Sequence, residues 1–98
     1  MDGFVYRLRS GYSDRRVGSK VYVLGPSGTM HILDNATAVF LWDAIGTLGK
    51  GEIDKLANEL VGHFDVSLEI ARSDVADFLS CLEGLEVLEK IPLRSDRS

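Results

Sequence analysis

Residues 15–45, RRVGSKVYVLGPSGTMHILDNATAVFLWDAI, decide the fold because a strand pattern and a helix pattern follow each other there. Residues 20–24 are β-branched and aromatic, as strands usually are. A Gly-Ser dipeptide before them fits a two-residue hairpin loop, so we expect residues 12–17 to form the preceding strand. A Gly-Pro-Ser-Gly turn then leads to a third short strand at residues 29–33. The stretch predicts a three-stranded antiparallel meander.

Helical periodicity takes over after the third strand. Asn35 or Asp34 supplies the N-cap oxygen of a first helix, which Gly46 and the glycines at 49 and 51 break. Ser67 caps a third helix that ends at Gly84. Between them, residues 53–64 show the pattern of a second helix. The residues expected to face inward are Ala38, Leu41, Trp42 and Ile45 on the first helix, Ile53, Leu56, Ala57, Leu60, Val61 and Phe64 on the second, and Ala71, Val75, Phe78, Leu79 and Leu82 on the third. An apolar tail of Leu85, Val87 and Leu88 is expected to fold back. The order β-β-β-α-α-α predicts an α+β domain.

Length and composition set the broad class. A chain of 98 residues, 45% hydrophobic and 27% charged, fits one soluble globular domain spanning residues 1–98. We expect its core at about residues 12–89, with 1–11 and 92–98 flexible. The net charge of −4 argues against a nucleic-acid or anionic-lipid partner. No apolar run approaches the roughly 20 residues of a membrane span and no signal-peptide pattern is present, so we expect a cytoplasmic protein.

No set of residues has the spacing of a catalytic or metal site. His31 and His63 have no Cys, His or carboxylate at ligand spacing, which favours surface or groove polarity. Cys81 lies among apolar residues and is expected to be a buried, inert thiol, with a Cys–His nucleophile as the alternative. Trp42 is expected in the core, with peptide anchoring as the alternative. We therefore expect no catalysis, no metal and no cofactor.

Both halves of the chain resemble the PqqD-like family, named for the biosynthesis of pyrroloquinoline quinone. Residues 15–45 carry two short strands, a Pro/Gly turn and a third strand leading into an Asn-led helix with Ala and then Trp. Residues 51–89, GEIDKLANELVGHFDVSLEIARSDVADFLSCLEGLEVLE, share the Glu-Ile pair, the Phe-Asp-Val turn, the Asp-Val-x-x-Phe-Leu-x-x-Leu helix and the apolar tail. The resemblance covers about residues 12–89. Asp34 departs from it, because the family usually runs from Leu directly to Asn, and this predicts a one-residue shift at the end of the third strand.

The resemblance implies a winged helix-turn-helix whose third strand is an open edge. There the leader segment of a ribosomally made precursor peptide pairs with the strand and lies against the third helix, as in β-augmentation. The chain then presents that peptide to a modifying enzyme, such as a radical-SAM enzyme or a leader peptidase. The residues so assigned to peptide binding are Thr29, Met30, His31, Ile32 and Leu33 on the strand, and Ile70, Arg72, Asp74, Val75 and Phe78 on the helix.

Two rival functions stay open. A winged-helix DNA-binding regulator shares the fold, but its recognition helix would normally carry Lys and Arg. Here Arg72 stands alone against four acids on the third helix, which should repel a duplex. A structural subunit that stabilises a partner enzyme is the other rival, and an exposed strand edge also leaves a homodimer open. Arg15, Arg16 and Lys20, with Arg7 and Arg9, serve either solubility or contact with an acidic peptide or enzyme surface.

Overall fold

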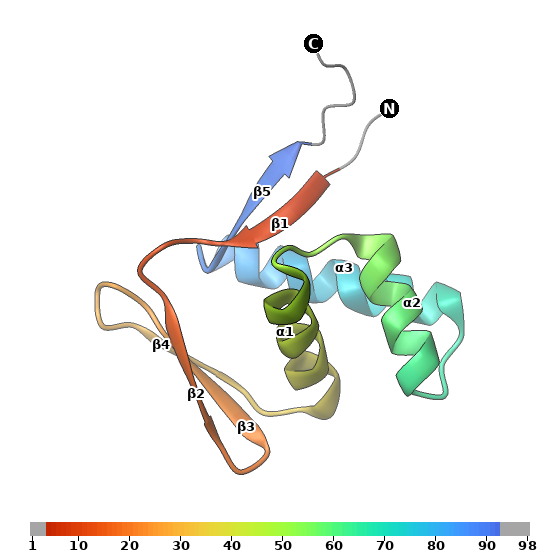
Figure 1. Cartoon of the computed structure of the whole chain (residues 1–98), viewed down its shortest axis with the longest axis horizontal. Coiled ribbons are helices and arrows are strands. Elements are labelled where there is room, and N and C mark those ends of the chain that lie inside the picture. The colour runs from red at the N-terminus through yellow and green to blue at the C-terminus, as the bar shows by residue number, and fades with distance from the viewer. Residues whose placement is uncertain (1–3, 93–98) are drawn as a thin grey trace.

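The computed structural model describes residues 4–92, which form two antiparallel sheets and three helices (Figure 1). In chain order the elements are β1 (Phe4–Leu8), β2 (Ser13–Val17), β3 (Lys20–Leu24), β4 (Met30–Leu33), α1 (Ala36–Leu48), α2 (Ile53–His63), α3 (Leu68–Gly84) and β5 (Leu88–Pro92). The α+β class and the sheet followed by three helices are confirmed, and β1 and β5 are additional.

The main sheet has the strand order β2-β3-β4, with both pairs antiparallel. Val17 pairs with Lys20 across the two-residue loop that the sequence predicted. Strand β4 begins at Met30, one residue later than expected, and the amide of Gly25 donates a hydrogen bond to the carbonyl of Thr29 in the turn before it (2.8 Å). In Figure 1 this sheet stands on one side of the molecule and the helices on the other.

Local capping chemistry sets the helix ends. The side chain of Asn35 accepts a hydrogen bond from the amide of Ala38 (2.8 Å), so Asn35 caps α1. Asp34 is exposed and joins β4 to α1, and β4 still ends at Leu33, so the extra residue lengthens the link. Gly49 ends α1 in the left-handed conformation (φ 80°), which glycine adopts without strain. Ser67 caps α3 by accepting a hydrogen bond from the amide of Ile70 (3.2 Å).

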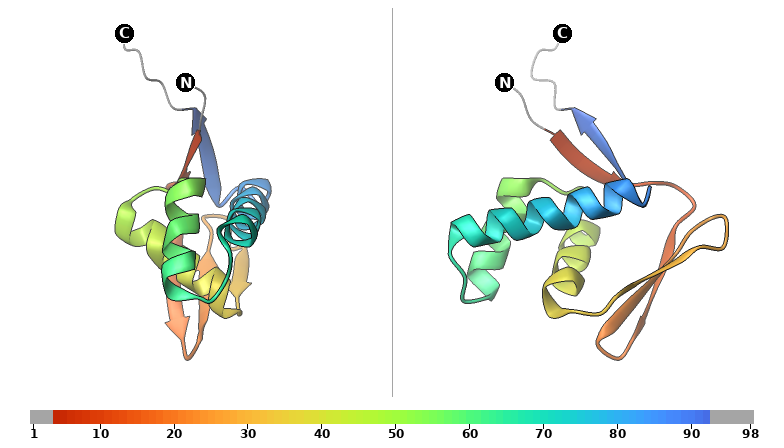
Figure 2. Two further views of the ribbon diagram at one scale, coloured as in Figure 1. Left: turned by 90° about the vertical axis from the view of Figure 1, so that its right-hand side faces the viewer. Right: turned by 180° about the vertical axis from the view of Figure 1, so that it is seen from behind.

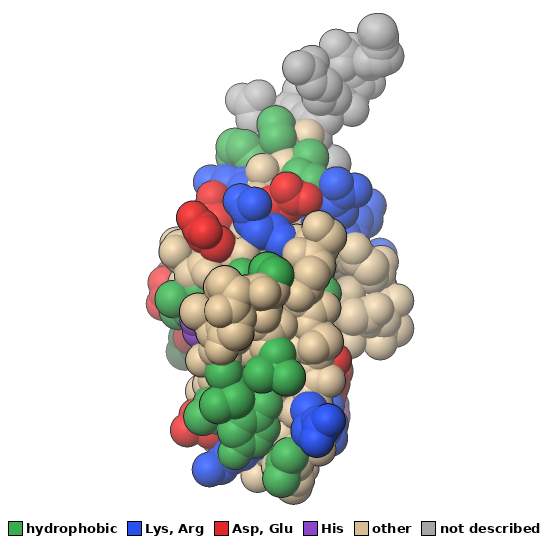
Figure 3. Space-filling model, turned by 90° about the vertical axis from the view of Figure 1, so that its left-hand side faces the viewer, with side chains coloured by type: hydrophobic (Ala, Val, Ile, Leu, Met, Phe, Trp, Pro, Cys, Tyr) green, Lys and Arg blue, Asp and Glu red, His purple; other side chains and the backbone are tan. Residues whose placement is uncertain are grey.

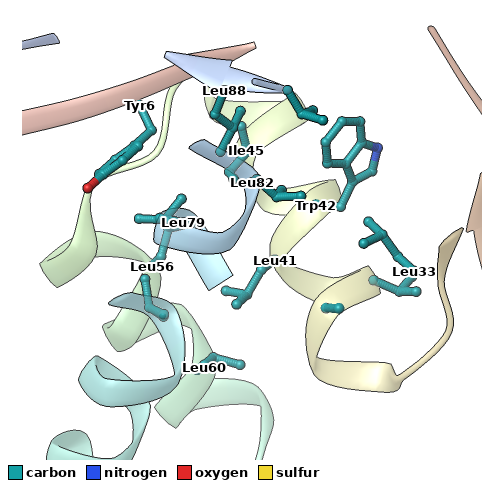
Figure 4. Packing of buried hydrophobic residues seen from close by; sticks show 14 of the residues in the cluster. Tyr6, Leu33, Leu41, Trp42, Ile45, Leu56, Leu60, Leu79, Leu82 and Leu88 are labelled. Carbon is teal, nitrogen blue, oxygen red and sulfur yellow. The ribbon is translucent and has the colours of Figure 1, made fainter. Parts of the chain in front are cut away.

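The core lies between the inner face of the sheet and the three helices. Figure 4 shows Leu33 of β4 and Trp42 of α1 in the same apolar cluster as side chains of α2 and α3. The largest fully buried side chains are Leu41, Leu56, Leu60, Leu79, Leu88, Val21, Val23, Val75 and Val87. Val61 and Leu85 were expected inside and are exposed instead, so these two predictions were wrong.

Strands β1 and β5 form a second, two-stranded sheet that the sequence analysis did not predict. Residues 1–11 were expected to be flexible, which is wrong for β1, where Val5 and Tyr6 are buried. Tyr6 exchanges two backbone hydrogen bonds with Gly51 in the α1–α2 loop (2.8 and 2.7 Å). Pro92 ends β5, and residues 93–98, also expected to be flexible, lie outside the described part. The two strands run together away from the helices (Figure 2).

Candidate functional site

Strand β4 lies at one edge of the main sheet. Within residues 4–92, β3 is its one strand partner, so the main-chain groups on its other side meet no strand. Such an edge offers N–H and C=O groups to an added strand. Side chains alternate along β4: Met30 and Ile32 point outward and are exposed, while His31 and Leu33 point toward the helices.

A shallow groove of about 410 Å³ lies between α3 and the first turns of α1. Its lining residues are Asn35, Thr37 and Leu41 on the α1 side and Asp74, Asp77, Phe78 and Cys81 on the α3 side. Asn35 follows the last residue of β4 by two positions, so the groove begins where the edge strand ends.

The periodicity of α3 explains which of its residues face the groove. Positions 74, 77, 78 and 81 fall on one helical face, while the buried Ala71, Val75, Leu79 and Leu82 fall on the adjacent face. Phe78 lies between the two faces and is partly buried against the core. Ile70 continues the groove face one turn toward the helix start, and its side chain is exposed. Helix α3 therefore packs into the core with one face and lines the groove with the other.

Two residues that were expected to line the cleft lie elsewhere. Val75 has no exposed area and belongs to the core, so its side chain cannot contact a bound peptide. Arg72 forms an ion pair with Asp54 of α2 (2.5 Å) and lies about half a helical turn away from the groove face. Phe78 and Asp74 do line the groove. The side chain of Leu33 is buried, which leaves its backbone as the part near the edge.

Cys81 was expected to be buried, and this was wrong: its thiol is exposed in the groove. The α1 lining, Asn35, Thr37 and Leu41, was also missed. The sequence does carry a signal for Asp77 and Cys81, because they repeat the helical spacing from Asp74. No sequence signal marks the α1 residues, because their place depends on how α1 packs beside α3.

The groove is acidic. Asp74 and Asp77 bring two carboxylates to its lining, which contains no Lys, Arg or His. His31 lies on β4, and His63 stacks on Phe40 with ring centroids 4.5 Å apart. Among residues 4–92 no group of three His, Cys, Asp or Glu side chains is placed to hold a metal ion. In the same residues no helix is long and apolar enough to span a membrane.

Trp42 is buried in the core, as expected, but its indole also borders a second pocket. This pocket, of about 270 Å³, lies where the β1–β2 connection meets α1, and Leu8, Tyr12 and Ile45 also line it. It shares no lining residue with the groove between α1 and α3.

An edge strand that ends at a helix-lined groove defines a small α+β domain able to accept an extended segment of another chain. The chain belongs to the PqqD family: residues 17–88 match the family model described as coenzyme PQQ synthesis protein D. A comparison with curated proteins finds no match.

Two solved structures have the same fold. "TbiB1 in Complex with the TbiA(beta) Leader Peptide" aligns with a TM-score of 0.76 at 20% identity, covering 92% of this chain and 99% of that one. "Lasso peptide synthetase B1 complexed with the leader peptide" aligns with a TM-score of 0.72 at 21% identity, covering 91% and 98%. Both similarities extend over nearly the whole of each chain.

Proposed function

We propose that this chain binds the leader segment of a ribosomally made precursor peptide and presents it to a modifying enzyme, without catalysing a reaction itself. The observation that carries the proposal is the edge of β4, which no other strand of residues 4–92 covers and which ends at the groove of α3. Membership of the PqqD family supports it, and so does the fold shared with two proteins solved with leader peptides.

The peptide pairs with β4 as an added strand. Main-chain hydrogen bonds to Met30–Leu33 supply affinity that does not depend on the peptide sequence, and Thr29 lies just before this edge. Side chains of the added strand alternate in direction. One set points toward the helices, beside His31, and the other joins Met30 and Ile32 on the outer side.

The groove selects the side chains that enter it. Phe78 gives it a partly buried apolar surface, and the carboxylates of Asp74 and Asp77 flank that surface on α3. An apolar peptide side chain next to Lys or Arg matches this arrangement, because the cation stays beside the carboxylates while the apolar group is buried. Ile70, exposed one turn away, extends the apolar contact.

The same charges oppose a DNA-binding role. The groove face of α3 carries Asp74 and Asp77, and the one arginine of this helix is engaged by Asp54 of α2. A helix that contacts phosphates needs free cations on its outer face. Our proposal therefore has two partners, first a precursor peptide and then a modifying enzyme, either a radical-SAM enzyme or a leader peptidase. The chain acts in the cytoplasm and forms one domain that spans its whole length.

A matched pair of phenylalanine variants tests the proposal. Phe78 lines the groove, whereas Phe64 packs beside Phe40 and His63 at the far end of α2, and both are partly buried against the core. The ligand is a fluorescent leader segment of the precursor peptide, titrated by anisotropy. We expect Phe78→Ala to weaken binding about tenfold or more, since a buried aromatic contact is lost.

Phe64→Ala should leave the affinity within about twofold, and thermal melts must show both variants folded at the assay temperature. Equal effects of the two variants would place the peptide outside the groove. An absence of binding to the wild-type chain would contradict the proposal as a whole.

A further inference from the structure

The outer face of the main sheet, turned away from the helices, carries exposed apolar side chains. The strand register brings outward positions together in three rows: Ser13, Leu24 and Met30; Arg15, Tyr22 and Ile32; and Val17 with Lys20. We call the side chains of Arg15, Val17, Lys20, Tyr22, Leu24, Met30 and Ile32 the outer face. Among residues 4–92, Val17 (54%), Met30 (52%) and Ile32 (49%) keep about half of their area exposed.

The apolar groups of the outer face gather in one area. Tyr22 is half-buried between its neighbours, and Leu24 is 37% exposed. Figure 3, which looks at the sheet side of the molecule, shows hydrophobic side chains gathered at the lower end with basic side chains beside them. Grouped apolar side chains on a soluble domain usually mark a protein contact.

The outer face is basic although the chain carries a net charge of −4. Arg15 and Lys20 are both exposed, and neither forms an ion pair within residues 4–92. Arg16 differs, since it points toward α1 and donates to both carboxylate oxygens of Asp43 at 2.6 Å. Asp14 of β2 points inward to Trp42, and Asp34 follows the end of β4, one position beyond the Val21–Leu33 pair. Two free cations therefore flank an apolar centre.

We infer that the outer face is the docking surface for the modifying enzyme, which meets it with an apolar patch flanked by Asp or Glu side chains. This inference rests on the proposed function. Charge complementarity favours an acidic partner. A second copy of this chain would bring the same two cations to the same kind of face, and the net negative charge of the chain opposes an anionic membrane.

The outer face is also continuous with the proposed peptide site. Met30 and Ile32 belong to both, because they are the outward residues of the edge strand β4. A leader strand added to β4 widens the sheet by one strand and contributes its own outward side chains to the outer face. The enzyme therefore contacts chain and leader together, so leader should raise the affinity for enzyme, and enzyme should raise the affinity for leader by the same factor.

Two pairs of variants test the outer face, with the purified modifying enzyme as the probe. Lys20→Glu on the outer face is matched by Lys55→Glu at an exposed position of α2, which makes the same change in net charge. Leu24→Ser is matched by Val61→Ser, because these side chains are 37% and 39% exposed. We expect Lys20→Glu and Leu24→Ser each to weaken enzyme binding by about fivefold or more, and their partners by less than about twofold.

Leader binding is measured in the same variants and separates the two proposals. Enzyme binding that falls while leader affinity stays within about twofold supports the docking surface. If the two variants of each pair bind the enzyme equally well, the docking surface is overturned and the proposed function still stands. A wild-type chain that dimerises, and becomes monomeric with Leu24→Ser, also overturns it by making a second copy the occupant. If the wild-type chain does not bind the leader at all, the proposed function itself fails.

Discussion

The indole Nε1 of Trp42 donates a hydrogen bond to Oδ2 of Asp14 at 2.7 Å, which ties α1 to β2. The next residue of α1, Asp43, accepts two hydrogen bonds from Arg16, two positions further along β2. Successive inward side chains of β2 are therefore held by neighbouring residues of one helix. Because β4 belongs to the same sheet and α1 lines the groove, these ties set where the edge of β4 lies relative to the groove.

Replacing the indole tests this connection. Trp42→Phe keeps an aromatic ring in the core but removes the indole donor of a part-buried hydrogen bond to the exposed residue Asp14. We expect a loss of about 1–3 kcal/mol of unfolding free energy, measured by urea denaturation. Asp14→Asn keeps an oxygen acceptor and should lose less. Equal stability of Trp42→Phe and wild type would show that this bond contributes nothing.

A charge placed on the buried face of α3 should unfold the domain rather than only block binding. Val75 is fully buried, so Val75→Asp forces a carboxylate into the core at a cost of several kcal/mol. Ile70→Asp, on the exposed groove face, is the control and should stay folded. Circular dichroism with a thermal melt measures both. A cooperative wild-type transition in Val75→Asp would contradict the assignment of Val75 to the core.

The features that the sequence predicts well are local ones. The caps at Asn35 and Ser67 and the hairpin loop before Lys20 depend on residues within four positions of each other. The pairing of β1 with β5 depends on segments from opposite ends of the chain, and no local pattern encodes it. The edge strand was predicted through the family resemblance, and its exposed edge depends on the strand order of the sheet.

The groove residues show the same limit in finer detail. Helical periodicity separates the buried and exposed sides of α3 but does not say which exposed residues lie beside another helix. Periodicity placed Val75 inside, where it lies, while the family resemblance also assigned it to the cleft, and Cys81 was assigned to the core although it is exposed in the groove. The packing of α1 beside α3 decides both positions, and this packing depends on tertiary structure.

Reversing one charge of the groove should change peptide affinity slightly. Asp77→Lys removes an exposed carboxylate that favours a basic peptide residue, so we expect leader binding to weaken by no more than about 1 kcal/mol. Titrations at two salt concentrations should show a smaller difference at high salt. A protein that read DNA would instead gain duplex affinity from this change. Duplex binding by Asp77→Lys with unchanged leader binding would favour that rival.

Removing the residues that could act in catalysis should leave the chemistry intact. Cys81, His31 and His63 lie on three different elements, α3, β4 and α2. Cys81→Ala, His31→Ala and His63→Ala should therefore retain the partner enzyme's turnover number at saturating chain, although His31→Ala should weaken leader binding because His31 lies on the edge strand. Steady-state assays at saturating chain and peptide measure this. A loss of several orders of magnitude from any one variant would reveal an active site on this chain.

The central claim is that a peptide joins β4 as an added strand. Amide chemical-shift mapping of the ¹⁵N-labelled chain, titrated with the leader segment, tests it most directly. We predict the largest shifts on Met30–Leu33 and on the groove face of α3, together with slower hydrogen exchange at the outer amides of β4. Shifts confined to α2 and the β1–β5 sheet, with unchanged exchange in β4, would contradict the account.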